Sequence, residues 1–214
     1  MNARAIVYVV DDDPSLCASL RSLIESTGLE VETFSTGREF LSHYRNDARP
    51  ACLVLDVRMP DMGGLQVQRE LAMRDVSLPI IFTTAFANVP MAVRAMRKGA
   101  VDFLEKPFDS NALLERIHEA LEVDRQRREK RTQKESTARK LATLSARERQ
   151  VMDFVIIGKA NKEIAYDLGL SQKTVEVHRA RLMKKLEVTS LAALVRLVTA
   201  RPEAGDSSQE NSDE

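Results

Sequence analysis

The sequence predicts two domains of different fold class: an α/β domain with a doubly wound five-stranded parallel sheet, then an all-α domain of four helices. Apolar strand-like segments alternate with amphipathic helices over residues 1–122, the pattern of a parallel sheet covered by helices on both faces. Residues 143–200 show helical periodicity throughout. Between them, residues 123–142 are a charged segment without Gly or Pro, either an exposed extension of the preceding helix or a solvated linker.

The first two strand–helix units open the chain. Residues 5–10, "AIVYVV", form a continuous β-branched run that is typical of a strand buried on both faces. A helix follows from Pro14, with apolar residues at i, i+4, i+7 and i+8 on one face, and Gly28 ends it. Residues 29–34, "LEVETF", alternate like a strand, and a short helix is predicted around residues 38–44.

The next three units complete the predicted sheet. "CLVLDV" and "PIIFTTA" are the third and fourth strands, and each precedes a helical segment, residues 65–73 and 90–98. The fifth strand and its exit loop are "VDFLEKPF". Asp109 or Ser110 caps the last helix of this domain, whose apolar face consists of Leu113, Leu114, Ile117 and Leu121.

The second domain consists of four predicted helices. "SARERQVMDFVII" begins with Ser145 and Glu148 at the spacing of a capping box. "NKEIAYDLGL" is a short helix closed by Gly169, and "SQKTVEVHRARLMKKL" begins at Ser171, a good N-cap residue. "SLAALVRLVTA" is the fourth, and the polar residues 201–214 are expected to form a disordered tail.

The net charge of zero hides a division along the chain. Residues 1–122 carry 13 Lys and Arg against 18 Asp and Glu, whereas residues 143–200 carry 10 against 6. The segment between them carries 8 basic against 3 acidic residues. An acidic first domain and a basic second domain indicate different partners, and the second partner is a candidate polyanion.

Composition also favours a cytoplasmic protein without a membrane segment. No apolar run approaches the roughly 20 residues of a membrane-spanning helix, and the N-terminus lacks the pattern of a secretory signal. The two cysteines, Cys17 and Cys52, lack the spacing of metal ligands. We expect them to be buried free thiols.

Acidic residues stand at the ends of two predicted strands. "VVDDD" places Asp11 and Asp12 directly after the first strand, and the third strand runs into Asp56. In a sheet of order 2-1-3-4-5 these strands are neighbours, so the three carboxylates are expected to converge beyond their carboxyl ends. Carboxylates packed closely repel each other unless a cation lies among them, and an all-oxygen site suits Mg²⁺.

Two further polar side chains follow the remaining strands. Thr84 ends the fourth strand, and Lys106 follows the fifth. Three carboxylates, a hydroxyl and an ammonium form a site for phosphoryl transfer, with Asp56 as the nucleophile that becomes an acyl phosphate. "DDD" alone is usually a turn or helix cap and a lone lysine is usually solvated, so it is the order of these signals along the strands that favours this interpretation.

The stretches "VVDDD", "LVLDVRMPDMGG", "TTAFA" and "FLEKPF" resemble the receiver domain of two-component response regulators, and the resemblance covers residues 4–122. It implies that Asp56 accepts a phosphoryl group from the phosphohistidine of a sensor histidine kinase. It also implies Mg²⁺ ligation by Asp12, Asp56 and the backbone carbonyl of Arg58, with Asp11 acting through a water.

The resemblance further implies a switch. Lys106 would pair with the phosphoryl group, and the bond before Pro107 is expected to be cis. In receiver domains phosphorylation draws the threonine hydroxyl, here that of Thr84, toward the phosphoryl oxygens, and an aromatic side chain, here Phe103, swings inward. Thr83 is expected to face the other side of the sheet. The remodelled face, from the fourth helix to the fifth strand, would favour a homodimer.

The second domain has the pattern of a helix-turn-helix. A short helix, the Gly169 turn and the longer helix from Ser171 fit this motif. The longer helix carries basic residues mostly away from its apolar positions: Lys173, Arg179, Arg181, Lys184 and Lys185. Such a face fits the major groove of DNA, although a charge run by itself is more often only a solvated surface.

The stretches "LSARERQVM" and "GKANKEIAYDLGLSQKTVEVHRARLMKKLEVTSLAALV" resemble the LuxR-type DNA-binding domain, and the chain as a whole resembles FixJ-like response regulators. The resemblance implies binding to promoter DNA and activation of transcription through RNA polymerase. Transferred by position, the base-reading residues are Glu176, Val177 and Ala180. The phosphate-contacting candidates are Lys162, Lys173, Thr174, Arg179, Arg181 and Lys184.

Two other classes of function remain open from the sequence. An aspartate-nucleophile phosphohydrolase also uses an Asp at a strand end with Mg²⁺, but such enzymes typically carry a second Asp two residues later, where this chain has Arg58. We therefore do not expect an enzyme. A signalling adaptor whose helical domain binds protein would show no salt-dependent binding to DNA.

Overall fold

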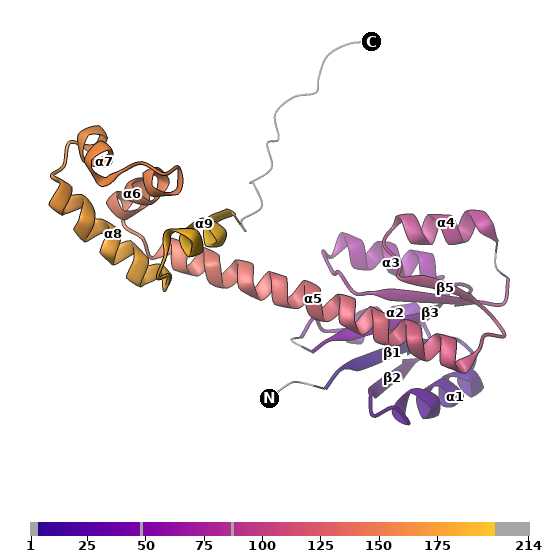
Figure 1. Ribbon diagram of the computed structural model, residues 1–214. Coiled ribbons are helices and arrows are strands. Elements are labelled where there is room, and N and C mark those ends of the chain that lie inside the picture. The colour runs from indigo at the N-terminus through magenta and orange to yellow at the C-terminus, as the bar shows by residue number, and fades with distance from the viewer. Residues whose placement is uncertain (1–3, 48, 87, 200–214) are drawn as a thin grey trace, which may run out of the picture. The chain divides into compact units, whose positions relative to one another are not determined.

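The computed structural model describes residues 4–47, 49–86 and 88–199, so the expected disordered tail lies outside the described residues. The chain divides between Glu129 and Lys130 into two compact units. Figure 1 shows an α/β unit at the N-terminal side and a helical unit at the C-terminal side, as the sequence predicts. Within the described residues, no helix carries an apolar stretch long enough to cross a membrane.

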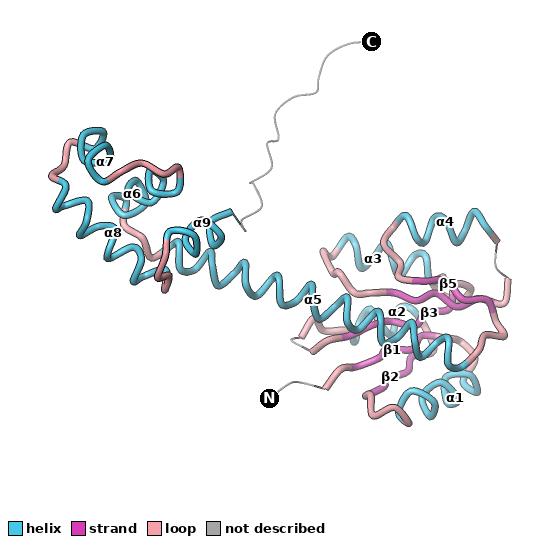
Figure 2. Tube along the Cα trace, viewed as in Figure 1, coloured by secondary structure: helices cyan, strands magenta, loops and turns pink. Residues whose placement is uncertain are grey.

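The first unit is built on a five-stranded parallel sheet with the predicted order β2-β1-β3-β4-β5 (Figure 2). Its strands pair in parallel because the helix after each of the first four strands returns the chain to the end of the sheet where that strand began. The strands are β1 (Ile6–Val10), β2 (Glu30–Phe34), β3 (Ala51–Asp56), β4 (Ile80–Thr84) and β5 (Asp102–Glu105).

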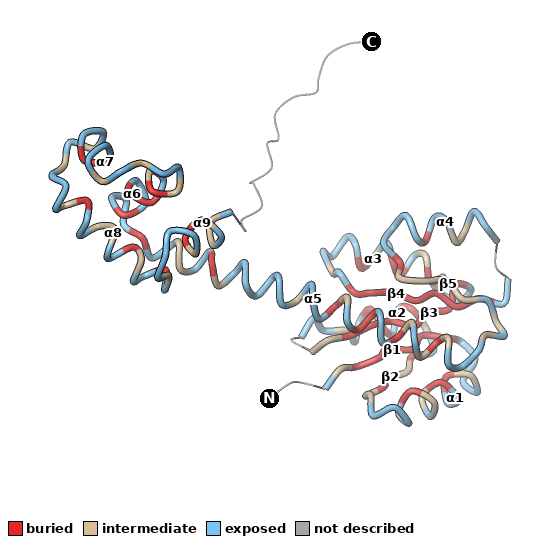
Figure 3. Tube along the Cα trace, in the orientation of Figure 1, coloured by how far each residue is buried: buried red, intermediate tan, exposed pale blue. Residues whose placement is uncertain are grey.

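Helices cover both faces of the sheet, and each face has its own apolar core. Helices α2 (Gly37–His43), α3 (Gly64–Met73) and α4 (Val89–Arg97) contribute Phe40, Leu71 and Ala95 to one core. Helices α1 (Pro14–Glu25) and α5 (Ser110–Ala142) contribute to the other. Figure 3 shows the buried strands between these layers, so the residues at the strand ends are held on a rigid frame.

Helix α5 continues through the whole of the charged segment as one helix of 33 residues. Asp109, rather than Ser110, caps it, because its Oδ1 accepts from the backbone N of Asn111 at 2.8 Å. The first compact unit extends to Glu129, beyond the predicted end of the first domain at residue 122. Asp124 is buried and accepts from the backbone N of Ala51 at 2.9 Å, so this part of the segment packs on the sheet.

The second unit holds the four helices that the sequence predicts, around one apolar core. They are α6 (Ala146–Ile156), α7 (Asn161–Leu168), α8 (Gln172–Leu186) and α9 (Leu191–Thr199). Gly169 ends α7 with φ +65°, a left-handed conformation that glycine adopts without a steric penalty. This turn directs α8 back across the core, where Val175, Leu182 and Leu186 are buried.

A buried carboxylate, that of Glu148, joins the start of α6 to the exposed Lys185 of α8. Ser145 and Glu148 form the predicted capping box: Glu148 N donates to Ser145 Oγ at 3.2 Å, and Ser145 N donates to Glu148 Oε2 at 2.8 Å. The same Oε2 accepts from Lys185 Nζ at 2.6 Å. The hydrogen bond from Lys185, followed by that from the Ser145 backbone, lowers the pKa of Glu148.

Replacing Glu148 with glutamine is expected to lower the free energy of unfolding of the second unit by about 1 kcal/mol at neutral pH, because the Ser145 backbone N–H and the exposed Lys185 both lose a charged acceptor. The ionised carboxylate stabilises the fold above the ordinary glutamate pKa of 4.5, and this contribution is lost as the pH falls through the lowered folded-state pKa. Urea unfolding at neutral pH and in acid should therefore show a smaller acid destabilisation for Glu148→Gln than for the wild type.

The matched control is Gln150→Ala, which removes only the exposed partner of Arg147 at 3.0 Å. Its effect on stability should stay below about 0.5 kcal/mol. A Glu148→Gln variant as stable as this control would show that the ionised Glu148 carboxylate contributes nothing to stability.

Candidate functional site

Two buried carboxylates from neighbouring strands meet at the carboxyl edge of the sheet. Asp11 follows β1 and Asp56 ends β3, and the parallel register that pairs Val10 with Leu55 sets them side by side. They are 3 % and 5 % exposed. Lys106, which follows β5, donates from Nζ to Asp11 Oδ2 and to Asp56 Oδ1, each at 2.6 Å.

The local backbone orients both Asp56 and Lys106. Asp56 Oδ2 accepts from the backbone N of Arg58 at 2.6 Å, so that Oδ1 faces the ammonium of Lys106. Lys106 N donates to the carbonyl of Thr84 at 2.7 Å, which extends the β4–β5 pairing by one residue. The Lys106–Pro107 bond is cis, as expected.

The electrostatics of the site follow from two carboxylates that share one ammonium. Burial raises the pKa of Asp56, and the hydrogen bond and charge of Lys106 oppose this shift only in part. Burial alone would lower the pKa of Lys106, but its hydrogen bonds to Asp11 and Asp56 outweigh that effect and the net shift is upward. When both acids are ionised the site keeps a net negative charge that attracts a further cation.

Asp12 does not join this pair. Its side chain is exposed, and among the residues that the structure describes no three His, Cys, Asp or Glu side chains are grouped closely enough to hold a metal. Asp11 and Asp56 lie together around the Lys106 ammonium, and ligation of a metal by Asp12 stays a prediction. The hard oxygen donors and the uncompensated charge nevertheless fit Mg²⁺ by their chemistry.

The two predicted switch residues lie on the α2–α4 face of the sheet. Thr84 is buried, and its Oγ1 accepts from the backbone N of Phe86 at 3.2 Å. Phe103 packs on Phe82, with ring centroids 6.2 Å apart. Thr83, in register with Asp56, lies on the opposite face from Thr84, because side chains alternate along a strand.

Helix α8 exposes most of the residues predicted to contact DNA. Ser171 caps it by accepting from Thr174 N at 3.1 Å. The predicted contact residues that are exposed on α8 are Lys173, Glu176, Val177, Ala180, Arg181 and Lys184, and Lys162 is exposed on α7. A shallow hollow at the N-terminal half of α8 is lined by Ser171, Lys173, Thr174, Val177, His178 and Arg181.

Thr174 and Arg179 are engaged within the protein. Thr174 Oγ1 lies 2.8 Å from the hydroxyl of Ser171, and Arg179 Nη1 donates to Asn161 Oδ1 at 3.0 Å. Arg179 thus joins α8 to the first residue of α7. Its predicted phosphate contact would require this hydrogen bond to be shared or broken.

Comparison with known proteins identifies both units. Residues 7–118 match the family described as the response regulator receiver domain, and residues 142–198 match the bacterial regulatory proteins of the luxR family. This chain is a two-component response regulator of the FixJ-like type. The fold, the buried acidic pair and the helix-turn-helix agree with that assignment.

The relatives of this response regulator match it over most of their length. It is 46 % identical over 196 residues to nodulation protein W of Bradyrhizobium diazoefficiens, covering 92 % of this chain and 86 % of that protein. It is 41 % identical over 194 residues to the transcriptional regulatory protein FixJ of Rhizobium meliloti, covering 91 % and 95 %. The solved structure of the response regulator StyR has a TM-score of 0.87 at 45 % identity, covering 93 % and 100 %.

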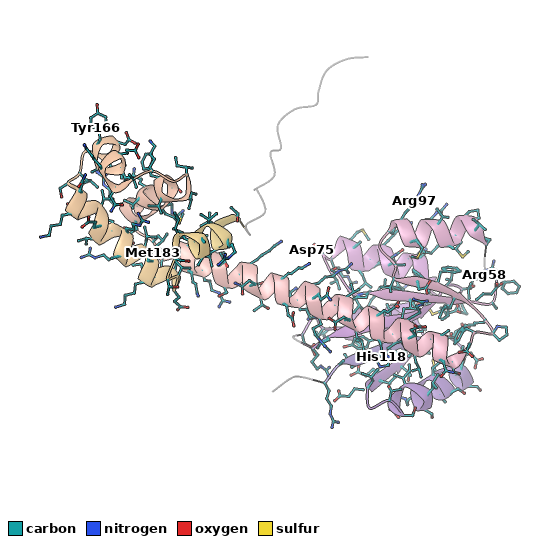
Figure 4. The ribbon with its side chains drawn as sticks, in the orientation of Figure 1. Arg58, Asp75, Arg97, His118, Tyr166 and Met183 are labelled. Carbon is teal, nitrogen blue, oxygen red and sulfur yellow. The ribbon has the colours of Figure 1, made fainter. Side chains whose placement is uncertain are left out.

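Sequence reasoning missed two features of the response regulator's surface. The guanidinium carbon of Arg58 lies 4.7 Å from the centroid of the exposed Phe86 ring, so a cation–π contact joins the loops after β3 and β4 beside the acidic pair. Tyr166 on α7 is 88 % exposed, and Figure 4 labels both Arg58 and Tyr166. Arg58 comes two residues after Asp56, and Phe86 comes two residues after Thr84. Their position just beyond two predicted site residues could have indicated this contact.

Replacing Gly64 with alanine is expected to disrupt the site, because a Cβ there would clash with the backbone oxygen of Asp56 and lie 3.0 Å from Leu55 Cγ. We expect a loss of about 3 kcal/mol in the free energy of unfolding of the first unit, measured by urea unfolding. Gly63→Ala is the control, since its Cβ would meet only the Val57 oxygen at 3.1 Å, and its loss should be below about 1 kcal/mol. Equal losses of stability for the two variants would show that the close approach of Gly64 to the Asp56 backbone does not determine the conformation of the loop after β3.

Proposed function

We propose that this response regulator accepts a phosphoryl group on Asp56 from a partner sensor histidine kinase and then binds promoter DNA through α8 to activate transcription. The observation that carries the proposal is the ammonium of Lys106 at 2.6 Å from both Asp11 and Asp56, in a buried site at adjoining strand ends. Because the kinase and promoter DNA are both partners inside the cell, we also propose a cytoplasmic location.

The chemistry assigned to Asp56 is a displacement at phosphorus. A carboxylate oxygen of Asp56 attacks the phosphohistidine, the phosphorus–nitrogen bond breaks, and its electron pair returns to the imidazole of the kinase. Lys106 stays beside the transferred oxygens and neutralises part of their charge. Asp12, Asp56 and the Arg58 carbonyl, with Asp11 through a water, would hold Mg²⁺, which supplies further positive charge to the phosphoryl group when bound.

The proposed response to phosphorylation is a change of the α4–β5 face. The Thr84 hydroxyl would exchange its bond to Phe86 N for a phosphoryl oxygen, and Phe103 would move inward against Phe82. Three exposed apolar residues of α4 support the proposal that two phosphorylated copies pair through this face: Val89, Val93 and Met96. A pair of second units would then bind adjacent half-sites and contact RNA polymerase.

Replacing Asp56 with asparagine is expected to reduce labelling by a radioactive small-molecule phosphodonor to background, because the amide lacks the nucleophilic oxygen. Asp61→Asn is the matched control, since Asp61 is an exposed acid of the same loop, and it should label like the wild type. A chelator should remove labelling of the wild type. Full labelling of Asp56→Asn would show that another residue is the phosphoacceptor.

Replacing Arg181 with alanine is expected to weaken DNA binding almost uniformly across sequences and to reduce the slope of log affinity against log salt by about 1, as the loss of one phosphate contact requires. Gel shifts on a random duplex pool over a salt series measure both effects. Arg196→Ala, an exposed arginine on α9, is the control and should leave the slope unchanged. A helical unit that binds protein instead would show no salt-dependent shift in any variant.

A further inference from the structure

A buried acid stands in the charged stretch of α5. Asp124 is 2 % exposed, although the residues around it in the sequence are mostly charged. Its Oδ2 accepts from the backbone N of Ala51 at 2.9 Å and also from Arg128 Nε. The contact satisfies the amide of the first residue of β3, which would otherwise be a buried donor without a partner.

Arg128 extends this contact to the chain before β3. Its Nη1 donates to the carbonyl of Asp47, its Nη2 lies 3.4 Å from Asn46 Oδ1, and its side chain is only 15 % exposed. Burial raises the pKa of Tyr44, and the nearby Arg128 guanidinium acts in the opposite direction. Together, Asp124 and Arg128 tie α5 to the segment between α2 and β3.

The neighbouring ion pairs of α5 have a different character. Arg125 pairs with Glu122, and Arg131 pairs with Glu135, within the helix itself, and all four side chains are more than half exposed. Such pairs contribute little to stability. The Asp124–Arg128 pair is desolvated and contacts the backbone of Ala51 and Asp47, which are distant in the sequence. Its geometry therefore specifies where the helix lies on the first unit.

Contacts from α5 and from the segment that precedes it reach both ends of β3. Asp124 holds Ala51 at the start of the strand, and Lys106, close before α5, holds Asp56 at its end. Among the described residues, Leu121 is the last α5 residue in the apolar core of the first unit. A charged helix continuing beyond that point without an anchor would fray, since an isolated helix of this length is marginal in water.

We propose that Asp124 and Arg128 are positioning residues that anchor α5 to β3, so that a change at Asp56 and Lys106 is transmitted along α5 toward the DNA-binding unit. A phosphoryl group on Asp56 changes the partners of Lys106 at one end of β3. With α5 pinned at the other end, the helix responds as a rigid body and the change is not lost by local fraying. The transmission, but not the anchor itself, rests on the proposed phosphorylation of Asp56.

The test uses the full-length protein with Asp124→Asn and Arg128→Ala, and Arg125→Ala as the exposed control on the same helix. In the unphosphorylated state, amide hydrogen exchange over residues 122–136 should be about tenfold faster or more in the two anchor variants and unchanged in the control. Asparagine loses the charge that pairs with Arg128 but keeps an acceptor for Ala51 N, so this variant is expected to fold if alanine at 128 does not.

A second readout separates transmission from simple structural support. Phosphate uptake at Asp56 should stay within about twofold of the wild type. The phosphorylation-dependent gain in affinity, measured on a duplex that the wild type selects from a random pool, should fall about tenfold in the anchor variants.

Each outcome decides the proposal. Unchanged exchange in both variants would overturn the anchor. Faster exchange with an intact gain in DNA affinity would overturn the transmission. If the wild type takes up no phosphate, the proposed function and the transmission are both wrong, and the exchange experiment still decides whether Asp124 and Arg128 anchor the helix.

Discussion

The functional site of the first unit depends on one ammonium that is shared by two buried carboxylates. Lys106 is 95 residues from Asp11 and 50 residues from Asp56 in the sequence, and it contacts each at 2.6 Å. Without it, two acids at neighbouring strand ends would repel each other in a poorly hydrated site. A parallel sheet brings the lysine to the two acids, because the carboxyl ends of all its strands lie at one end of the sheet and Lys106 directly follows β5.

The same arrangement leaves one negative charge of the site without a partner, and this charge can attract a cation. Two ionised carboxylates and one ammonium leave negative charge in a buried place, where burial raises the pKa of Asp56. Such a site attracts cations and holds a carboxylate in a defined orientation. A buried ion pair is weak evidence for stability, so the placement of Asp11, Asp56 and Lys106 points to reactivity rather than to folding.

Buried carboxylates recur where elements distant in sequence must be joined. Lys185 on α8 meets Glu148 at the start of α6, and Arg128 on α5 meets the chain before β3 through Asp124. In both places a carboxylate also accepts a backbone N–H, so the buried acid satisfies a donor as well as a cation. The basic residues that stay exposed on α8 are those that remain available to a partner.

The sequence by itself determined the order of strands and helices along the chain, the residues at the strand ends and the helix-turn-helix, because each is encoded in short-range periodicity and capping residues. The alternation of strands and helices also indicated a parallel sheet. Only the tertiary structure decided that Asp12 is exposed, that Asp124 is buried, and that Arg179 bonds Asn161. The contact of Asp124 with Ala51 spans 73 positions. A local pattern of charge cannot report such a contact, because the burial of a charged side chain depends on partners that only folding brings near.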